Sequence, residues 1–253
     1  MPHRGTAGTS CLWLLLLCLA GGCSLGQGKG NSASSLLTVD DILGRCGEAY
    51  LQTQTLQVRG LMRDYRGDQR SVLPISWDYL RPDRCRLQID MDMALVVGED
   101  WWTYDQAKGR FTSHHETTST PIETAAYFLS EGMPFFLPDA LARGEGTFHA
   151  RDYRRQAKWT LDGVTWFAER PCYVLTRVGL GRDHGSRWMV WIDQDQFLIR
   201  GWVWEAMRPD RRQRTLMGCT YFEVVANHAI APQRFQVVKP HPIALPRREA
   251  PAG

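Results

Sequence analysis

The fold class follows from a strand–turn–strand pattern that is clearest in the stretch Trp77-Asp78-Tyr79-Leu80-Arg81-Pro82-Asp83-Arg84-Cys85-Arg86-Leu87. Aromatic and aliphatic side chains on both sides of the stretch favour extended backbone. The residues Arg81-Pro82-Asp83 between them favour a tight turn, because proline fixes one backbone angle and aspartate bonds to its own backbone. A turn this short joins two strands that run antiparallel and lie side by side.

The same pattern continues outward in both directions along the chain. Short turns that contain Gly or Asp separate segments with strand character, and these segments follow one another as sequence neighbours. The predicted strands are Leu56–Met62, Val72–Leu80, Arg84–Met91, Leu95–Val97, Trp101–Tyr104, Ala157–Leu161, Val164–Ala168, Cys172–Val178, Arg187–Asp193, Phe197–Ala206 and Arg214–Val225. The sequence therefore predicts antiparallel meanders.

Two regions favour helix instead. Thr38 can cap a helix whose apolar side chains recur at helical spacing as far as Tyr50. Residues 121–143 interrupt the strands, with a helix that begins at Pro121 and a short one over Asp139–Arg143. The apolar segment Gly132–Pro138 between them is predicted to form the mouth of a cavity or a loop that touches a membrane. The alternative is an ordinary packed loop.

Several strands are apolar on both faces, although a one-sided antiparallel sheet should be polar on its solvent face. This holds for Trp101-Trp102, for Trp188–Ile192 and for Phe197–Trp204. Helices can cover one face, and the other then requires a partner, a membrane or a ligand in a hollow. The alternative is that these side chains simply pack under the helical segments and the tail.

The N-terminus has the three parts of a secretory signal. Arg4 is the only charged residue before Cys23, Leu12–Leu19 is apolar, and Ala20-Gly21-Gly22 are small. The apolar run is shorter than the roughly 20 residues that span a bilayer. The pattern predicts a signal peptide over 1–22 and a flexible tether over 23–36, followed by a domain over 37–239 and a loose tail over 240–253. The alternative is an ordinary secretory signal that is cut near Ala20.

Composition and motifs exclude several classes of function. The formal net charge of +3 gives no reason to expect a nucleic-acid partner. Neighbouring strand residues point to opposite faces, so His114-His115-Glu116 cannot converge on one metal ion. The chain has no Gly-x-Ser-x-Gly or His-Glu-x-x-His motif. The sequence predicts no enzyme, no cofactor and no metal site.

Four cysteines follow the predicted tether: Cys46, Cys85, Cys172 and Cys219. They are either buried free thiols or partners in disulfides, which an oxidising compartment permits. If a disulfide forms, Cys172–Cys219 is the favoured pair, since both residues lie in the middle of predicted strands.

Short motifs in five of these segments resemble those of a known family. They are Leu56–Gly60, Trp77–Leu87, Gly98–Asp105, Pro171–Leu175 and Val190–Asp193. In this order, and over the chain from about Val39 to Val238, they resemble the LolA/LolB-like family of periplasmic lipoprotein carriers and outer-membrane lipoprotein-sorting proteins. The resemblance implies an α+β fold in which an unclosed antiparallel half-barrel of about eleven strands has helices across its open side.

The resemblance also implies roles for individual residues. Leu19-Ala20-Gly21-Gly22-Cys23 is similar to the lipobox of bacterial lipoproteins, in which the cysteine carries lipid. Arg81 stands where the family's latch arginine bonds to the lid helices, although it could instead pair with a surface acid near a turn. Aromatic residues would line the hydrophobic cavity, and the candidates are Trp77, Trp101, Trp102, Tyr104, Phe128, Phe135, Phe136, Trp188, Trp191 and Trp202.

Together these expectations describe a lipoprotein that is anchored through Cys23 and faces the periplasm, with the outer membrane as the expected location. Its expected ligands are lipid or lipoprotein acyl chains, and its task is their reception or transfer. The alternative is a regulatory or structural envelope protein that uses the same fold to bind a protein partner.

Overall fold

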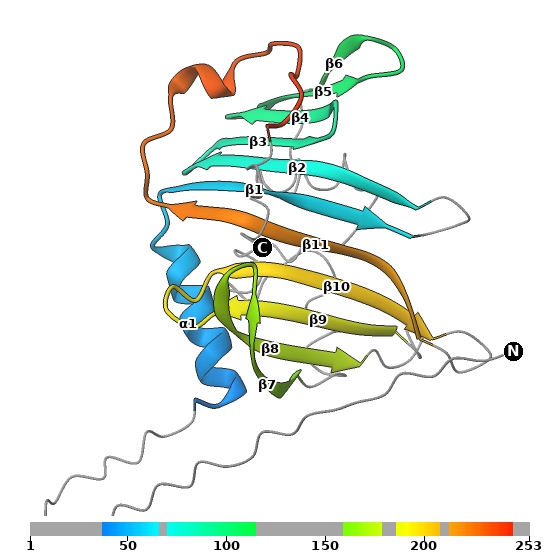
Figure 1. Ribbon diagram of the computed structural model, residues 1–253. Helices are drawn as coiled ribbons and strands as arrows, with labels where there is room; N and C mark the ends of the chain where they lie inside the picture. Colours follow the sequence, from blue (N-terminus) through cyan, green and yellow to red (C-terminus); the bar gives the residue numbers. More distant parts are fainter. Residues whose placement is uncertain (1–36, 66–69, 115–158, 179–185, 208–212, 245–253) are drawn as a thin grey trace, which may run out of the picture. The chain divides into compact units, whose positions relative to one another are not determined.

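One antiparallel sheet of eleven strands organises the chain (Figure 1). The structure, a computed structural model, describes residues 37–65, 70–114, 159–178, 186–207 and 213–244. The strands are β1 (Thr55–Asp64), β2 (Ser71–Leu80), β3 (Arg84–Ile89), β4 (Asp92–Val97), β5 (Asp100–Asp105), β6 (Arg110–His114), β7 (Trp159–Phe167), β8 (Arg170–Val178), β9 (Ser186–Asp193), β10 (Ile199–Met207) and β11 (Gln213–Ala226).

The sheet consists of two meanders that meet in its middle. Its spatial order is β6-β5-β4-β3-β2-β1-β11-β10-β9-β8-β7, so β6 and β7 form two separate edges. Among the described strands, the two meanders pair with each other only through β1 and β11, with Leu56 opposite Ala226 and Asp64 opposite Met217. The predicted unclosed sheet of about eleven strands is confirmed.

The register defines two faces. The inner face carries Val58, Trp77, Val190 and Trp202, which belong to the main hydrophobic cluster. The outer face carries the alternate residues, which include Arg59, Asp78 and Arg86.

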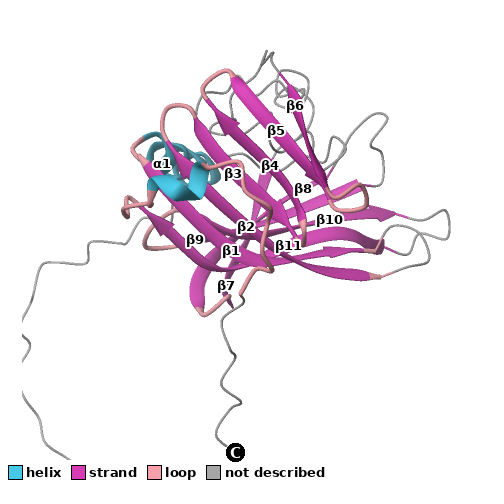
Figure 2. Ribbon diagram, turned by 90° about the horizontal axis from the view of Figure 1, so that it is seen from above, coloured by secondary structure: helices cyan, strands magenta, loops and turns pink. Residues whose placement is uncertain are grey.

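Helix α1 (Val39–Leu51) covers part of the inner face. Thr38 caps it as expected: the Asp41 backbone N–H donates to the Thr38 side chain, and the Thr38 N–H donates to the Asp41 carboxylate. Ile42, Cys46 and Tyr50 are buried in the inner-face cluster. Figure 2 shows α1 in cyan at the ends of the strands.

The C-terminal segment covers part of the outer face. The short helix η2 (Pro232–Phe235) contacts β3 and β4, and Phe235 is buried in a second apolar cluster with Met93, Leu95 and Tyr104. The segment from Ile230 to His241 thus lies on the face that α1 leaves free. The backbone oxygen of His241, which lies in the predicted loose tail, accepts a hydrogen bond from Gln88 Nε2 at 2.6 Å.

Three expectations need correction. Residues 159–167 form one strand, not two, because a bulge between Leu161 and Gly163 absorbs the apparent turn. A second bulge between Ile199 and Gly201 places Ile199 and Trp202 in the same buried cluster, although strict alternation assigns them to opposite faces. The disulfide Cys172–Cys219 is absent: all four cysteines of the described residues are free.

The sheet order explains the unpaired cysteines. Cys172 lies on β8 and Cys219 on β11, with β9 and β10 between them. Strand spacing of about 4.8 Å puts them roughly 14 Å apart across the sheet, far beyond disulfide reach.

The helices expected within 121–143 lie outside the described residues. Among the residues that are described, none of the helices has the length and apolarity needed to cross a membrane.

Candidate functional site

Four of the predicted cavity residues meet on the inner face. Trp77, Trp101, Trp188 and Trp202 are all buried members of the main cluster. The ring of Trp188 lies 5.9 Å from that of Trp202, and the Trp202 indole N–H donates to the Tyr221 hydroxyl at 3.2 Å. This aromatic cluster extends over both meanders, since Trp77 is on β2 and Trp188 on β9.

Three other predicted cavity residues lie on the outer face and so do not share this surface. Trp102 and Tyr104 pack in the cluster around Phe235. Trp191 stacks on Phe167 with ring centroids 4.5 Å apart, opposite Gly201. Phe128, Phe135, Phe136 and the predicted lipidation site Cys23 lie outside the described residues.

Arg81 binds the C-terminal end of α1. Its Nε donates to the carbonyl oxygen of Thr53 and its Nη2 to that of Tyr50, both at 3.1 Å. Tyr50 lies in the last turn of α1 and Thr53 just after it, where carbonyl groups lack the regular bond to a residue four positions on, so the guanidinium adds bonds to this end of the helix. The predicted latch residue therefore contacts the helix that lies on the inner face.

The same end of α1 is also attached to the other meander. The Tyr50 hydroxyl accepts a hydrogen bond from the backbone N–H of Ile199, the first residue of β10, at 3.0 Å. Burial raises the pKa of Tyr50, so this hydroxyl stays protonated at physiological pH. The end of α1 is thus bound to β2 through Arg81 and to β10 through Tyr50.

The inner face becomes exposed at the β7 edge. Leu161, Val164 and Trp166 of β7 lie opposite Leu175, Tyr173 and Pro171 of β8, which places them on one face. Trp166 is 72% exposed, Val164 56% and Leu161 36%. Sequence reasoning missed this patch because alternation puts Leu161 and Val164 on opposite faces. Gly163 inside a strand was the available sign of the bulge that aligns them.

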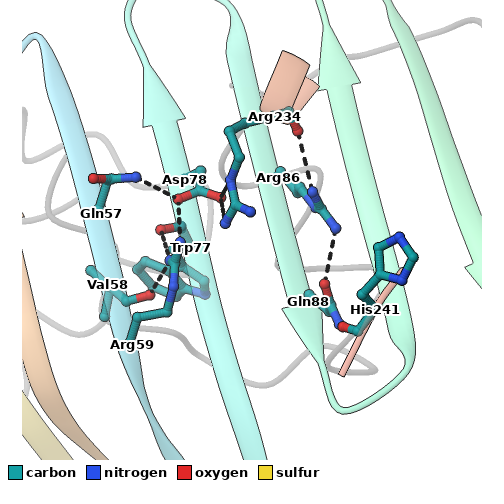
Figure 3. Close-up of polar contacts among 9 residues, drawn as sticks. All are labelled: Gln57, Val58, Arg59, Trp77, Asp78, Arg86, Gln88, Arg234 and His241. Carbon is teal, nitrogen blue, oxygen red and sulfur yellow. Dashed lines mark hydrogen bonds and ion pairs between the residues drawn. The ribbon is translucent and has the colours of Figure 1, made fainter. Parts of the chain in front are cut away.

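The outer face carries a buried cluster of charges (Figure 3). Asp78 is fully buried and pairs with Arg59 at 2.9 Å and with Arg234 of the C-terminal segment at 2.8 Å. Arg86, one strand further along, donates to Gln88 Oε1 at 3.1 Å. Burial and the neighbouring Arg234 lower the pKa of Arg86. The cluster holds the C-terminal segment against β2 and β3, and nothing in the sequence pattern indicates it.

A groove of about 690 Å³ opens where the end of α1 meets β11 and the turns after β7 and β9. Its lining is largely polar and carries charges of both signs, including Glu169, Arg170, Arg200 and Glu223. A lining of this kind differs from the apolar cavity that the sequence predicts. Among the described residues no three side chains of the metal-binding types lie together.

Comparison with known proteins finds similarity in fold but not in sequence. No family model matches the sequence, and no curated protein matches it either. The chain is similar to MucB in the solved Pseudomonas aeruginosa MucA/MucB complex, with 15% identity over 81% of this chain and a TM-score of 0.51. It spans 63% of the MucB chain's length.

Other similar structures have lower scores. A LolA superfamily protein from Nitrosomonas europaea has 12% identity, a TM-score of 0.35 and coverage of 79% of this chain and 98% of its own. The Mycobacterium tuberculosis lipoprotein LppX has 10% identity, a TM-score of 0.44 and coverage of 77% and 99%. At these identities the likeness concerns the fold alone.

Proposed function

We propose that this chain is a lipid-anchored envelope protein that binds a hydrophobic ligand, a lipid or the acyl chains of a lipoprotein, on the inner face of its sheet. One observation carries the proposal: the inner face is apolar and aromatic across both meanders, and α1 lies on it. Burial of each CH₂ group contributes roughly 0.8 kcal/mol, so one or two acyl chains suffice for affinity. No catalytic residue is required.

Uptake in this proposal exchanges the contacts of α1 for contacts with the ligand. The apolar side of α1, formed by Ile42, Cys46 and Tyr50, occupies the surface that acyl chains would cover. Arg81 acts as the latch, because displacement of α1 breaks its two bonds to the helix end. The lipid on Cys23 would keep the domain at the membrane from which it receives ligand. In this proposal that membrane is the outer membrane, and the domain faces the periplasm.

The test uses a chain that begins at residue 24 and so lacks the anchor. This chain keeps the whole compact unit Leu37–Gly253, to which every described element belongs. Titration with a fluorescent fatty acid should give saturable binding, and mass spectrometry should find co-purified lipid. Arg81→Leu should change the rates of uptake and release. Arg84→Leu, which removes the same charge from the next strand, is the control and should not.

Protein that purifies free of lipid and does not respond to the fatty acid would overturn the proposal. A protein partner is the second candidate function, and the similarity to MucB favours it, because that protein was solved in complex with MucA. In that case a partner, and not an acyl chain, would contact the inner face.

A further inference from the structure

The exposed apolar patch of β7 results from one irregularity in the sheet. In a regular strand Leu161 and Val164 would point to opposite faces, since side chains alternate. The bulge between Leu161 and Gly163 shifts the register by one residue, so that Leu161, Val164 and Trp166 share the inner face. Gly163 adopts a φ of +134°, which favours glycine. Local backbone geometry thus presents three large apolar side chains side by side on an edge strand.

This patch differs from the other exposed apolar residues of the described strands. Val72 on β2 and Val178 on β8 are as exposed, at 53% and 51%, but each lies on the outer face. The three residues of β7 instead continue the buried inner-face cluster, which Trp159 of the same strand joins. A contiguous exposed patch at the margin of a core indicates a contact surface, whereas scattered single residues do not.

The size of the patch favours a lipid bilayer over a protein. A stable protein interface buries about 800 Å² on each partner, which three side chains do not supply. A membrane interface needs only a few amphipathic anchors, and tryptophan is the side chain most suited to it.

The length of chain before the domain places a bilayer within reach. Between Cys23 and Leu37 lies a Gly- and Ser-rich stretch of about a dozen residues. A flexible tether of this length, which the sequence predicts, would have a root-mean-square length of roughly 20 Å. The described chain begins at α1, and α1 contacts β7. A lipid on Cys23 would therefore keep this edge of the sheet within a few tens of ångströms of the headgroups.

We infer that the β7 edge, through Trp166, Val164 and Leu161, docks onto the surface of the phospholipid bilayer and turns the inner face of the sheet toward it. The inference rests on the proposed lipid anchor and specifies how a tethered domain meets its ligand source. An acyl chain could then pass from the bilayer to the inner face along a continuous apolar surface.

The experiment is flotation of the chain from residue 24 with vesicles of phosphatidylethanolamine and phosphatidylglycerol. The wild-type chain should float with the vesicles. Trp166→Ser should lower the partition constant roughly tenfold, and Val164→Ser by a smaller factor. Trp166→Phe should retain most of the binding. Val178→Ser and Val72→Ser remove similarly exposed side chains from the outer face and should leave the partition unchanged. Thermal melting of each variant checks that the fold is intact.

The fatty-acid titration, carried out without vesicles, separates this inference from the proposed function. Docking predicts that Trp166→Ser loses much more of its vesicle partition than of its fatty-acid affinity, because the proposed ligand surface is the buried part of the inner face under α1, whereas Trp166 is 72% exposed. A wild-type chain that does not float, or a Trp166→Ser chain that floats equally well, overturns the inference. A loss of fatty-acid affinity in Trp166→Ser as large as its loss of vesicle partition also overturns it, because the patch would then serve the ligand site and not the bilayer. Flotation that depends on Trp166, in a chain that binds no fatty acid, would leave docking intact and remove the proposed function.

Discussion

The guanidinium of Arg81 and the carbonyl oxygen of Tyr50 join the turn after β2 to the last turn of α1, with Nη2 and O 3.1 Å apart. The Tyr50 side chain reaches the opposite meander, where its hydroxyl accepts the Ile199 N–H. One residue of α1 therefore connects the helix to both halves of the sheet. The end of α1 is held more tightly than the burial of its apolar side chains alone would hold it.

Arg81→Leu should loosen α1. The variant loses two charge-assisted bonds, one to the Tyr50 carbonyl in the last turn of α1 and one to the Thr53 carbonyl just after the helix, and a bond of this kind contributes about 1.5–3 kcal/mol. We expect faster amide hydrogen exchange in α1 and a lower urea midpoint. Arg81→Lys should lie between the variant and the wild type, since a single ammonium can satisfy only part of the geometry. Exchange in α1 at the wild-type rate would show that Arg81 does not hold the helix.

Asp78→Asn should be strongly destabilising. It removes the carboxylate between Arg59 and Arg234 and leaves two guanidinium groups facing each other on the outer face. We expect a loss of about 2–4 kcal/mol in the free energy of unfolding, somewhat below the usual range for a buried pair because Arg234 is partly in water. Asp105→Asn breaks the exposed pair with Lys108 and is the matched control, with little change expected. Urea unfolding of both variants measures the difference.

Two glycine substitutions should act in opposite directions. An added Cβ at Gly201 would meet the Cys219 carbonyl oxygen at 2.5 Å and the Phe167 ring at 2.7 Å, so Gly201→Ala should cost about 1–3 kcal/mol. Gly44 lies in α1 with open space around its Cβ position, and Gly44→Ala should stabilise by about 0.5–1 kcal/mol. Thermal or urea unfolding decides both, and equal effects would contradict the packing around Gly201.

The four cysteines of the described residues should resist alkylation while the protein is folded. Burial raises the pKa of Cys46 and Cys219 to about 12 and that of Cys172 to about 11, and it raises the pKa of Cys85 further. Iodoacetamide at pH 8.5 should label the chain from residue 24 only after denaturant is added. Rapid labelling without denaturant would contradict the burial of these thiols.

The same shifts predict a loss of stability in alkali. The unfolded thiols ionise above their ordinary pKa of 9.0, whereas the folded thiols remain neutral. Stability from these groups is fully present below pH 9 and is lost as the pH rises toward 12. Substitution of Cys46 by Ser, whose hydroxyl does not titrate in this range, should flatten the slope. An unfolding free energy that stays constant from pH 9 to 11 would argue against it.

Local sequence signals predicted the features that depend only on residues close together in the sequence. The cap at Thr38 and the turn at Arg81-Pro82-Asp83 were confirmed, and so was the antiparallel pairing of consecutive strands. The bulge at Gly163 was missed. One extra residue in a strand reverses which face the preceding side chains point to, and the amino-acid composition of the strand gives no sign of it. The error hid the exposed patch on β7 until the register was known.

Contacts between residues far apart in the sequence could not be predicted from the sequence pattern. Arg234 and Asp78 pair across more than half of the chain, and Phe235 fills an outer-face cluster with residues of β4 and β5. The sequence therefore showed that the outer face carries apolar residues where polar ones are expected. It did not show that the C-terminal segment packs over them. Trp102 and Tyr104 were grouped with the inner-face aromatics for the same reason.

The pairing of β1 with β11 has a consequence for the order in which the chain can fold. Leu56 finds its partner, Ala226, only after almost the whole domain has been synthesised. Each meander can form from sequence neighbours, but each then has an unsatisfied edge at the place where the two must join. Closing this junction involves contacts of high sequence separation, which form slowly. Until then the unpaired margins of β1 and β11 can pair with other strands, so the half-folded chain is most prone to aggregation at this junction.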